Sequence, residues 1–235
     1  MTVSRRDFVI AGVGSACALA TTGVKMAEAQ TTQGGPQHKE PQAARQSMLP
    51  DRMPELSEGN MTPAQKQAAA EFSGGKALSV PGPFVALLRS PEVMLRTKAL
   101  GEYLYSTKSV PSKLKEFAIL ITARQWTQQY TWDIHYPIAL NAGLDQQVAQ
   151  ALAEGSRPEG MTPEEQIVYE FCTELHRNQS VSDPAYARVA GRYGEEGVID
   201  LLSICGFYTF MSMILNTART ALPKGAATPL PSFPR

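Results

Sequence analysis

The stretch from residue 116 to residue 135 carries the residue types best suited to chemistry in this chain. Glu116 precedes a continuous apolar run, Arg124 follows that run, and His135 comes shortly afterwards in an aromatic segment. A carboxylate, a guanidinium and an imidazole around so apolar a run cost free energy to bury. Ionisable groups held at such a cost gather at functional sites, so we predict the site of chemistry in this stretch.

The run between Glu116 and Arg124 predicts a buried helix, because its apolar residues occupy all sides. Burial disfavours the charged form of a carboxylate, which suits Glu116 to act as a general acid or base near neutral pH. Arg124 follows about 12 Å further along the axis, so a single helix does not let the two side chains touch. In an alternative interpretation, Glu116 is an exposed first-turn carboxylate stabilised by the helix dipole.

A second helix is expected over the aromatic segment. Gln128, Trp132 and His135 are spaced by four and three residues and therefore share one helical face. We expect Trp132 to stack beside His135 and keep the imidazole partly dry. Pro137 should kink this helix just beyond the histidine. A lone histidine in such a segment is more often structural than catalytic, and that alternative stays open.

The elements that must position these residues are helical. Thr62 to Gln65 and Thr162 to Glu165 each combine a capping residue, a first-turn proline and a capping-box side chain. Apolar residues then recur at intervals of three and four, and no segment alternates as a half-buried strand does. We predict an all-α, single-domain bundle of about seven to nine helices over residues 61–222. Before the apolar run, Val80 to Phe84 forms a rigid turn that presents Phe84 in a fixed direction.

Both ends of the chain differ from this domain. Arg5 and Arg6 precede a weakly apolar run, and small residues offer a cleavage site after Ala29, so residues 1–29 are predicted to be a twin-arginine export signal. An uncleaved membrane anchor is the alternative, although the run is poorly apolar for a span of about 20 residues. We therefore expect the protein to be periplasmic or secreted and to have no stable membrane span. Residues 30–60 read as a flexible leader or an arm on a neighbour, and the proline-rich residues 223–235 as an extended arm.

Composition narrows the partners. The chain is 43% hydrophobic with a formal net charge of zero, and it lacks long Lys/Arg blocks, which argues against nucleic acid as the main binding partner.

Its histidines, His38, His135 and His176, form no metal-ligand cluster in sequence, so no metal site is expected. His176 suits a last-turn helix cation. Cys172 and Cys205 lie in apolar segments outside any CxxC pair, either as buried small hydrophobes or, in an oxidising compartment, as a bridge.

The order of residues in the central stretch resembles the signature of the carboxymuconolactone decarboxylase family, an all-α superfamily that also includes alkylhydroperoxidase D. The resemblance rests on Glu116, the run Ala123 to Trp132, His135, and the run Ala139 to Leu144. Segments in family order extend it to about residues 50–223, among them Val80 to Phe84 upstream and Gly206 to Tyr208 downstream. It implies the fold of that superfamily, proton-transfer roles for Glu116 and His135, no cofactor, and a homotrimer or homohexamer, for which the helix from Gly206 to Asn216 would suit an interface.

The chain departs from the peroxidase branch of this superfamily, which carries a C-x-x-C-x-x-x-H motif. Gln128 and Thr131 stand where the two cysteines belong, while Glu116 and His135 are retained. Peroxide reduction by a vicinal dithiol requires that pair, so the departure argues against it. The resemblance is closer to the decarboxylase branch.

These observations give one main hypothesis, a cofactor-independent lyase or isomerase acting on a small carboxylated or lactone-like molecule. Arg124 would hold a carboxylate or enolate oxygen, while Glu116 and His135 move protons. The expected catalytic residues are Glu116, His135 and Arg124, and the expected substrate-binding residues are Tyr130, Trp132, Trp126, Gln128 and Phe84. The alternative is a non-catalytic ligand-binding or accessory protein outside the cytoplasm, since one fold hosts many functions.

Overall fold

The computed structural model describes residues 50–222 and 230–231. Its contacts divide the chain into residues 1–38 and residues 39–235, and every described residue belongs to the second unit. The predicted export signal, His38 and most of the predicted leader and C-terminal arm therefore lie outside the described residues.

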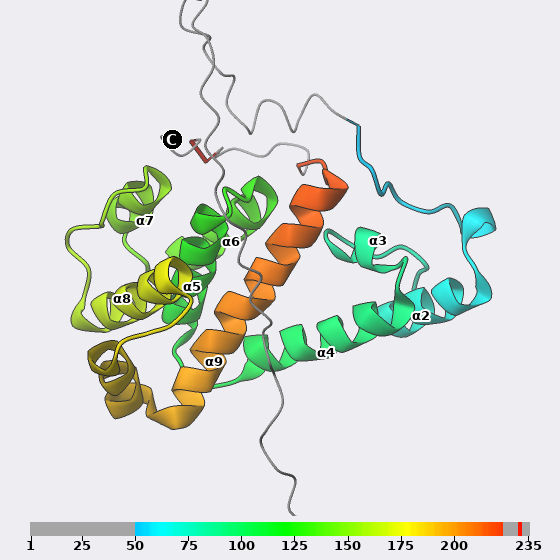
Figure 1. The fold of residues 1–235 in the computed structure, drawn as a ribbon. Helices are drawn as coiled ribbons and strands as arrows, with labels where there is room; N and C mark the ends of the chain where they lie inside the picture. The colour runs from blue at the N-terminus through cyan, green and yellow to red at the C-terminus, as the bar shows by residue number, and fades with distance from the viewer. Residues whose placement is uncertain (1–49, 223–229, 232–235) are drawn as a thin grey trace, which may run out of the picture. The chain divides into compact units, whose positions relative to one another are not determined.

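The described part of the chain is all-helical, with no strand in it, as Figure 1 shows. It contains one 3₁₀ turn and eight α-helices, which confirms the all-α class and the expected number. The elements are η1 (Glu58–Asn60), α2 (Pro63–Ser73), α3 (Phe84–Leu87), α4 (Pro91–Ser106), α5 (Ser112–Gln125), α6 (Gln129–Asn141), α7 (Gln146–Ala153), α8 (Pro163–Asn178) and α9 (Asp183–Ala218).

Local sequence fixes where these helices start. Thr62 and Thr162 each accept a hydrogen bond from the third residue of the helix they precede, and the side chain of that residue bonds back to the cap. Both predicted capping boxes are thereby confirmed, each with a proline in the first turn. Helix α6 continues through Pro137 to Asn141.

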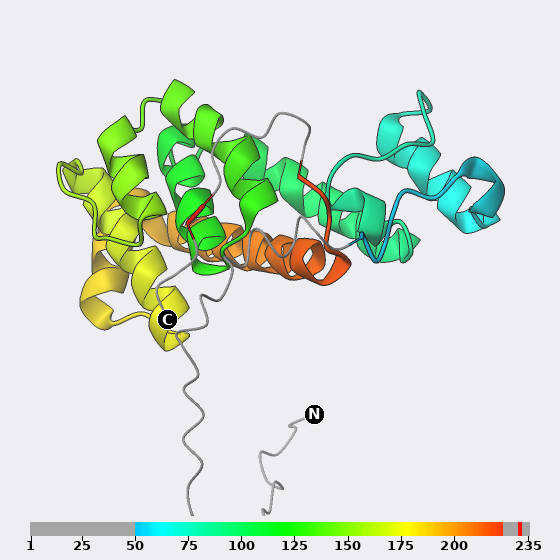
Figure 2. The same ribbon diagram turned by 90° about the horizontal axis from the view of Figure 1, so that it is seen from above.

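Helix α5 lies at the centre of the main core. Every residue from Leu114 to Arg124 is buried, which confirms the predicted buried helix. The helix contacts α6, α7, α8 and α9, and its Phe117 and Leu120 pack in one cluster with Trp132 and Phe171. A second cluster joins α2, α3 and α4 around Met94, and Phe207 of α9 packs against both clusters. Figures 1 and 2 show α5 to α8 gathered at one end of the helical array and α2 and α3 at the other.

Helix α9 connects these clusters. Gly194 interrupts it with a φ of 71° and a ψ of 177°, so two helical segments meet there at a kink. A positive φ of this size favours glycine, which lacks the Cβ that would strain the backbone. By length and composition α9 is apolar enough to cross a membrane, yet Leu201, Ile204 and Leu215 of the same helix are buried in the domain core. Core helices of folded domains pass the same test.

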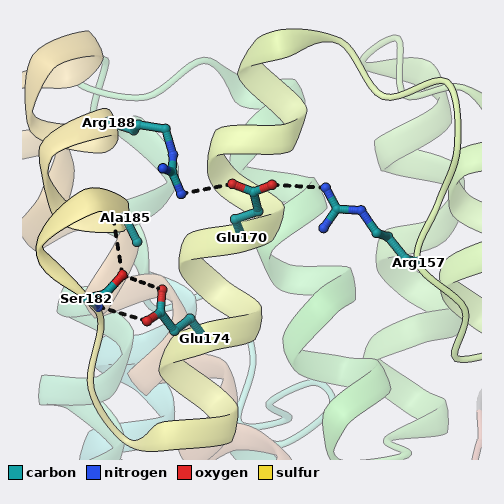
Figure 3. Close-up of polar contacts among 6 residues, drawn as sticks. All are labelled: Arg157, Glu170, Glu174, Ser182, Ala185 and Arg188. Carbon is teal, nitrogen blue, oxygen red and sulfur yellow. Dashed lines mark hydrogen bonds and ion pairs between the residues drawn. The ribbon is translucent and has the colours of Figure 1, made fainter.

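Helices α8 and α9 are also joined at the surface, as Figure 3 shows. Glu170 accepts from Arg157 and from Arg188, each at 2.9 Å. Glu174 accepts from the backbone and hydroxyl of Ser182, the residue that caps α9, at 2.9 and 3.1 Å. Exposed ion pairs stabilise little individually. Together, these contacts fix how the start of α9 meets α8.

The described part of the predicted leader lies on its own chain. The backbone N–H of Arg52 donates to the carbonyl oxygen of Ala218 at 2.7 Å. Arg89 donates to the carbonyl oxygen of Pro54, also at 2.7 Å, and Ser79 donates to Glu55 at 2.6 Å. Residues 52–55 are therefore anchored to α9 and to the segments on either side of α3.

Candidate functional site

Helices α5 and α6 bring Glu116 and His135 into direct contact. The Oε2 atom of Glu116 lies 2.8 Å from Nδ1 of His135. Glu116 is 5% exposed, while His135 is half-buried. When Nδ1 carries a proton it donates to the carboxylate, which orients the ring and stabilises an imidazolium. The two residues are thus arranged as a carboxylate–imidazole pair for proton transfer.

This pair lies between two cavities. The first, of about 460 Å³, is lined by His135 together with Phe84, Tyr130 and Met211. The second, of about 490 Å³, is lined by Glu116 together with Lys108 and Lys115. The two cavities share the lining residues Gly101, Tyr105, Phe207 and Tyr208. A small molecule in either cavity would therefore be adjacent to one member of the pair.

Tyr208 of α9 completes the surroundings of the histidine. Its ring meets the His135 ring edge-on, with 5.0 Å between the ring centroids. Burial raises the pKa of Tyr208 well above its ordinary value, and the charge of Glu116 adds to that shift. The phenol therefore stays protonated at neutral pH and can donate a hydrogen bond. Gly206 to Tyr208 belong to the segments that carry the family resemblance, but no sequence pattern predicted a place for Tyr208 in the site.

Two lysines line the second cavity, and they differ in how far they are buried. Lys115 is buried, and its ammonium donates to the carbonyl oxygens of Leu104, Tyr105 and Thr107 at 2.8 to 3.0 Å. Burial lowers the pKa of this lysine, and its three donors stabilise the C-terminal end of α4. Lys108, by contrast, is exposed. Its ammonium group is therefore accessible from solvent at the edge of this cavity.

Of the predicted substrate-binding residues, Phe84 and Tyr130 line the first cavity, and three others occupy structural positions. Trp132 is 1% exposed and stacks on Tyr136 with 5.7 Å between ring centroids, so the expected stacking beside His135 is wrong. Trp126 donates to Thr209 at 3.2 Å. Gln128 caps α6 and donates to Asn216 at 3.0 Å. The Trp126 indole and the Gln128 amide thereby join the connection between α5 and α6 to α9.

Arg124 lies with the C-terminal segment and not with Glu116 and His135. Its Nη1 donates to the carbonyl oxygen of Pro231 at 2.9 Å. Beside it, Gln129 both donates to and accepts from the backbone of Leu230, each at 2.7 Å. Arg124 is 2% exposed and is absent from the lining of both cavities described above. In this structure its side chain is bonded to the short described segment at residues 230–231.

Gln128 and Thr131, which stand where the C-x-x-C-x-x-x-H motif has its two cysteines, make different contacts. The Gln128 side chain accepts from the Thr131 backbone N–H at 2.9 Å, which closes the first turn of α6. Thr131 lines the first cavity.

Within residues 50–222 and 230–231, no three His, Cys, Asp or Glu side chains come together as metal ligands would. No family model and no curated protein matches the chain.

Proposed function

We propose that this protein is a cofactor-independent lyase or isomerase that moves a proton on a small carboxylated or lactone-like molecule. The observation that carries the proposal is the 2.8 Å contact between Glu116 and His135, placed between two cavities with mainly apolar walls. Cavities of this size accommodate small organic molecules. The residue order that resembles the carboxymuconolactone decarboxylase family supports the same reaction class and the same fold.

His135 is the proposed acid–base group. With Glu116 stabilising its protonated form, the imidazole removes a proton from a carbon next to a carbonyl group and returns it to a neighbouring atom. Tyr208 and Tyr130 are phenols whose pKa values are raised mainly by burial, so both can donate to a developing enolate oxygen. The apolar walls strengthen these interactions because they keep the local dielectric constant low.

Lys108 replaces Arg124 as the proposed contact for a substrate anion. It lines the second cavity next to Glu116 and is exposed, whereas Arg124 is bonded to the C-terminal segment. Lys98 lines the first cavity but is paired with Glu102 on the same helix. A substrate that spans the two adjoining cavities would place its carboxylate at Lys108 in the second and its reacting carbon at His135 in the first.

The test is proton exchange with solvent. The protein is incubated in D₂O with a panel of lactones and unsaturated acids, and NMR follows both product formation and deuterium incorporation next to the carbonyl. We expect at least one compound to exchange or convert, and His135→Gln to abolish this. Glu159→Gln, at an exposed carboxylate that lines neither cavity, is the matched control. Binding without exchange or product across the panel would instead favour the ligand-binding alternative.

We also propose that the protein is exported by the twin-arginine route and assembles into a homotrimer or homohexamer. Large apolar side chains are exposed along α4 and α9, including Tyr105 at 69% and Ile199 at 59%, and association would cover them. Light scattering at micromolar concentration should give a multiple of the chain mass, and a monomeric mass would overturn the assembly. Replacing Arg5 and Arg6 with lysine should retain the protein in the cytoplasm.

A further inference from the structure

Helix α5 makes a second contact with a histidine, away from the Glu116 pair. The Thr122 hydroxyl lies 2.9 Å from Nε2 of His176 on α8, and it also donates to the carbonyl oxygen of Ala118 at 2.9 Å. Because a hydroxyl has one proton, its oxygen accepts from the imidazole N–H. His176 is therefore held by α5, in addition to its expected place in the last turn of α8.

Two thiols lie in the same region. Cys172 of α8 and Cys205 of α9 are both buried, and their Sγ atoms are 3.5 Å apart although they are separated by 33 positions in sequence. The close contact with Cys172 lowers the pKa of Cys205 against the opposing effect of burial, and the nearby His176 lowers that pKa further. The pKa of Cys172 is raised. The pair is therefore unequal, with Cys205 better suited to carry a thiolate.

We propose that Cys172 and Cys205 form a redox-active dithiol that hydrogen peroxide converts into an intramolecular disulfide, with Cys205 as the attacking thiol and the nearby His176 as a group that favours its thiolate. The Cys205 thiolate attacks one peroxide oxygen and breaks the O–O bond, giving a sulfenic acid and hydroxide, which takes up the thiol proton as water. The Cys172 thiol then attacks the sulfenic sulfur and releases a second water. Two thiols are oxidised and one peroxide is reduced to two waters.

The geometry permits this step with little rearrangement. A disulfide requires about 2.05 Å between sulfur atoms, so the two Sγ atoms must approach by about 1.5 Å, which side-chain rotation can supply. The partner helices are already held together by the Glu170 and Glu174 contacts visible in Figure 3. Burial of both thiols excludes bulky reagents, so the site selects small oxidants. It is separate from the Glu116–His135 pair and does not depend on the proposed function.

The experiment uses the full chain carrying C17S, so that Cys172 and Cys205 are the remaining thiols. After exposure to hydrogen peroxide, the protein is denatured, alkylated and weighed, and the linked peptides are identified by mass spectrometry. We expect a mass lower by two hydrogens, no alkylation, a Cys172–Cys205 peptide, and reversal by a dithiol reductant. The disulfide should raise Tm by roughly 10 °C, because it closes a loop of 33 positions. Two alkylated thiols after peroxide treatment would overturn the proposal and leave the residues as buried apolar side chains.

Variants assign the two roles. In C172S, a sulfenic acid at Cys205 should accumulate and be trapped by dimedone, whereas C205S should give none. His176→Asn should slow disulfide formation about tenfold, since it removes a group that favours the thiolate. Arg177→Gln changes the neighbouring exposed cation of the same helix turn and should leave the rate unchanged. Equal rates for the His176 and Arg177 variants would remove His176 from the proposal. Peptide mapping of the C17S chain shows whether the disulfide forms, even if a cysteine variant fails to fold.

Discussion

Helix α5 contacts a histidine at two places, and the surroundings of the two contacts differ. At Glu116 the partner is a carboxylate, and the contact with His135 lies between two cavities. At Thr122 the partner is a hydroxyl, and the contact with His176 lies beside two buried thiols. The two positions are about 120° apart around the helix. Both histidines are half-buried, but His135 lies beside a cavity, which we call the open contact, and His176 lies beside thiols enclosed in the core, which we call the closed contact.

The difference shows that the packing around a histidine decides which reactions it can take part in. A buried carboxylate is tolerated only with a partner, so Glu116 and His135 must stay together. The cavities beside them cost packing contacts, which a purely structural pair would not require. Thiols at the closed site behave as small hydrophobes and contribute to the core unless a small oxidant reaches them. We therefore expect substitutions at the open contact to change turnover and those near the closed contact to change stability.

The largest expected effect is on turnover at the open contact. Glu116→Gln keeps the shape of the side chain but removes the charge that stabilises the His135 imidazolium, so kcat should fall by about 10²- to 10⁴-fold. Steady-state kinetics with the substrate found by the exchange screen measures this. Glu159→Gln, at an exposed position that lines neither cavity, should remain near the wild-type rate. Equal rates for the two variants would make the Glu116–His135 pair structural.

The next effect concerns Arg124, at the end of α5. Arg124→Ala removes a buried stem and leaves the carbonyl oxygen of Pro231 without this donor, so the free energy of unfolding should fall by about 2–3 kcal/mol. Urea unfolding measures the loss. Arg96→Ala, on the exposed face of α4, should change stability by less than about 0.5 kcal/mol. A loss of turnover at full stability would return Arg124 to the catalytic role that its position in sequence suggested.

A smaller effect is expected from the closed contact. Thr122→Val keeps the volume of the side chain but removes the hydroxyl that bonds His176 and Ala118. The free energy of unfolding should fall by about 1–2 kcal/mol, because the imidazole loses a buried partner. Thermal and urea unfolding both report this change. A stability equal to the wild type would mean that the His176 contact contributes no net free energy.

The smallest effect is the alkaline pH dependence of Tyr208. Its pKa in the folded protein is raised above the ordinary value of 10, so the unfolded chain loses this proton first. Its contribution to stability is therefore present in full below pH 10 and is lost as the pH rises towards the folded pKa. Tyr208→Phe should flatten this decline by about 1 kcal/mol between pH 10 and pH 11. Tyr105→Phe, at a mostly exposed ring, is the control. Urea unfolding at a series of pH values gives the free energy of unfolding, and parallel curves for wild type and Tyr208→Phe would contradict the raised pKa of Tyr208.

The helices were predictable because their signals are local. The capping boxes at Thr62 and Thr162 and the apolar run before Arg124 depend on residues within a few positions of one another, and the structure has them as expected. The direction of Trp132 was not predictable in this way. Its place in sequence puts it on the face of His135, but a large apolar ring is most stable in the core, where it stacks on Tyr136.

By itself, the sequence determined the helical class, the buried α5 and the residue types at its ends. Only the tertiary structure decided which of those groups meet. It joined Glu116 to His135, added Tyr208 from α9, placed Arg124 at the C-terminal segment, and brought Cys172 to Cys205. The physical reason is that helix signals act over three or four residues, whereas these contacts depend on how α6, α8 and α9 pack around α5, which the burial of the whole chain determines.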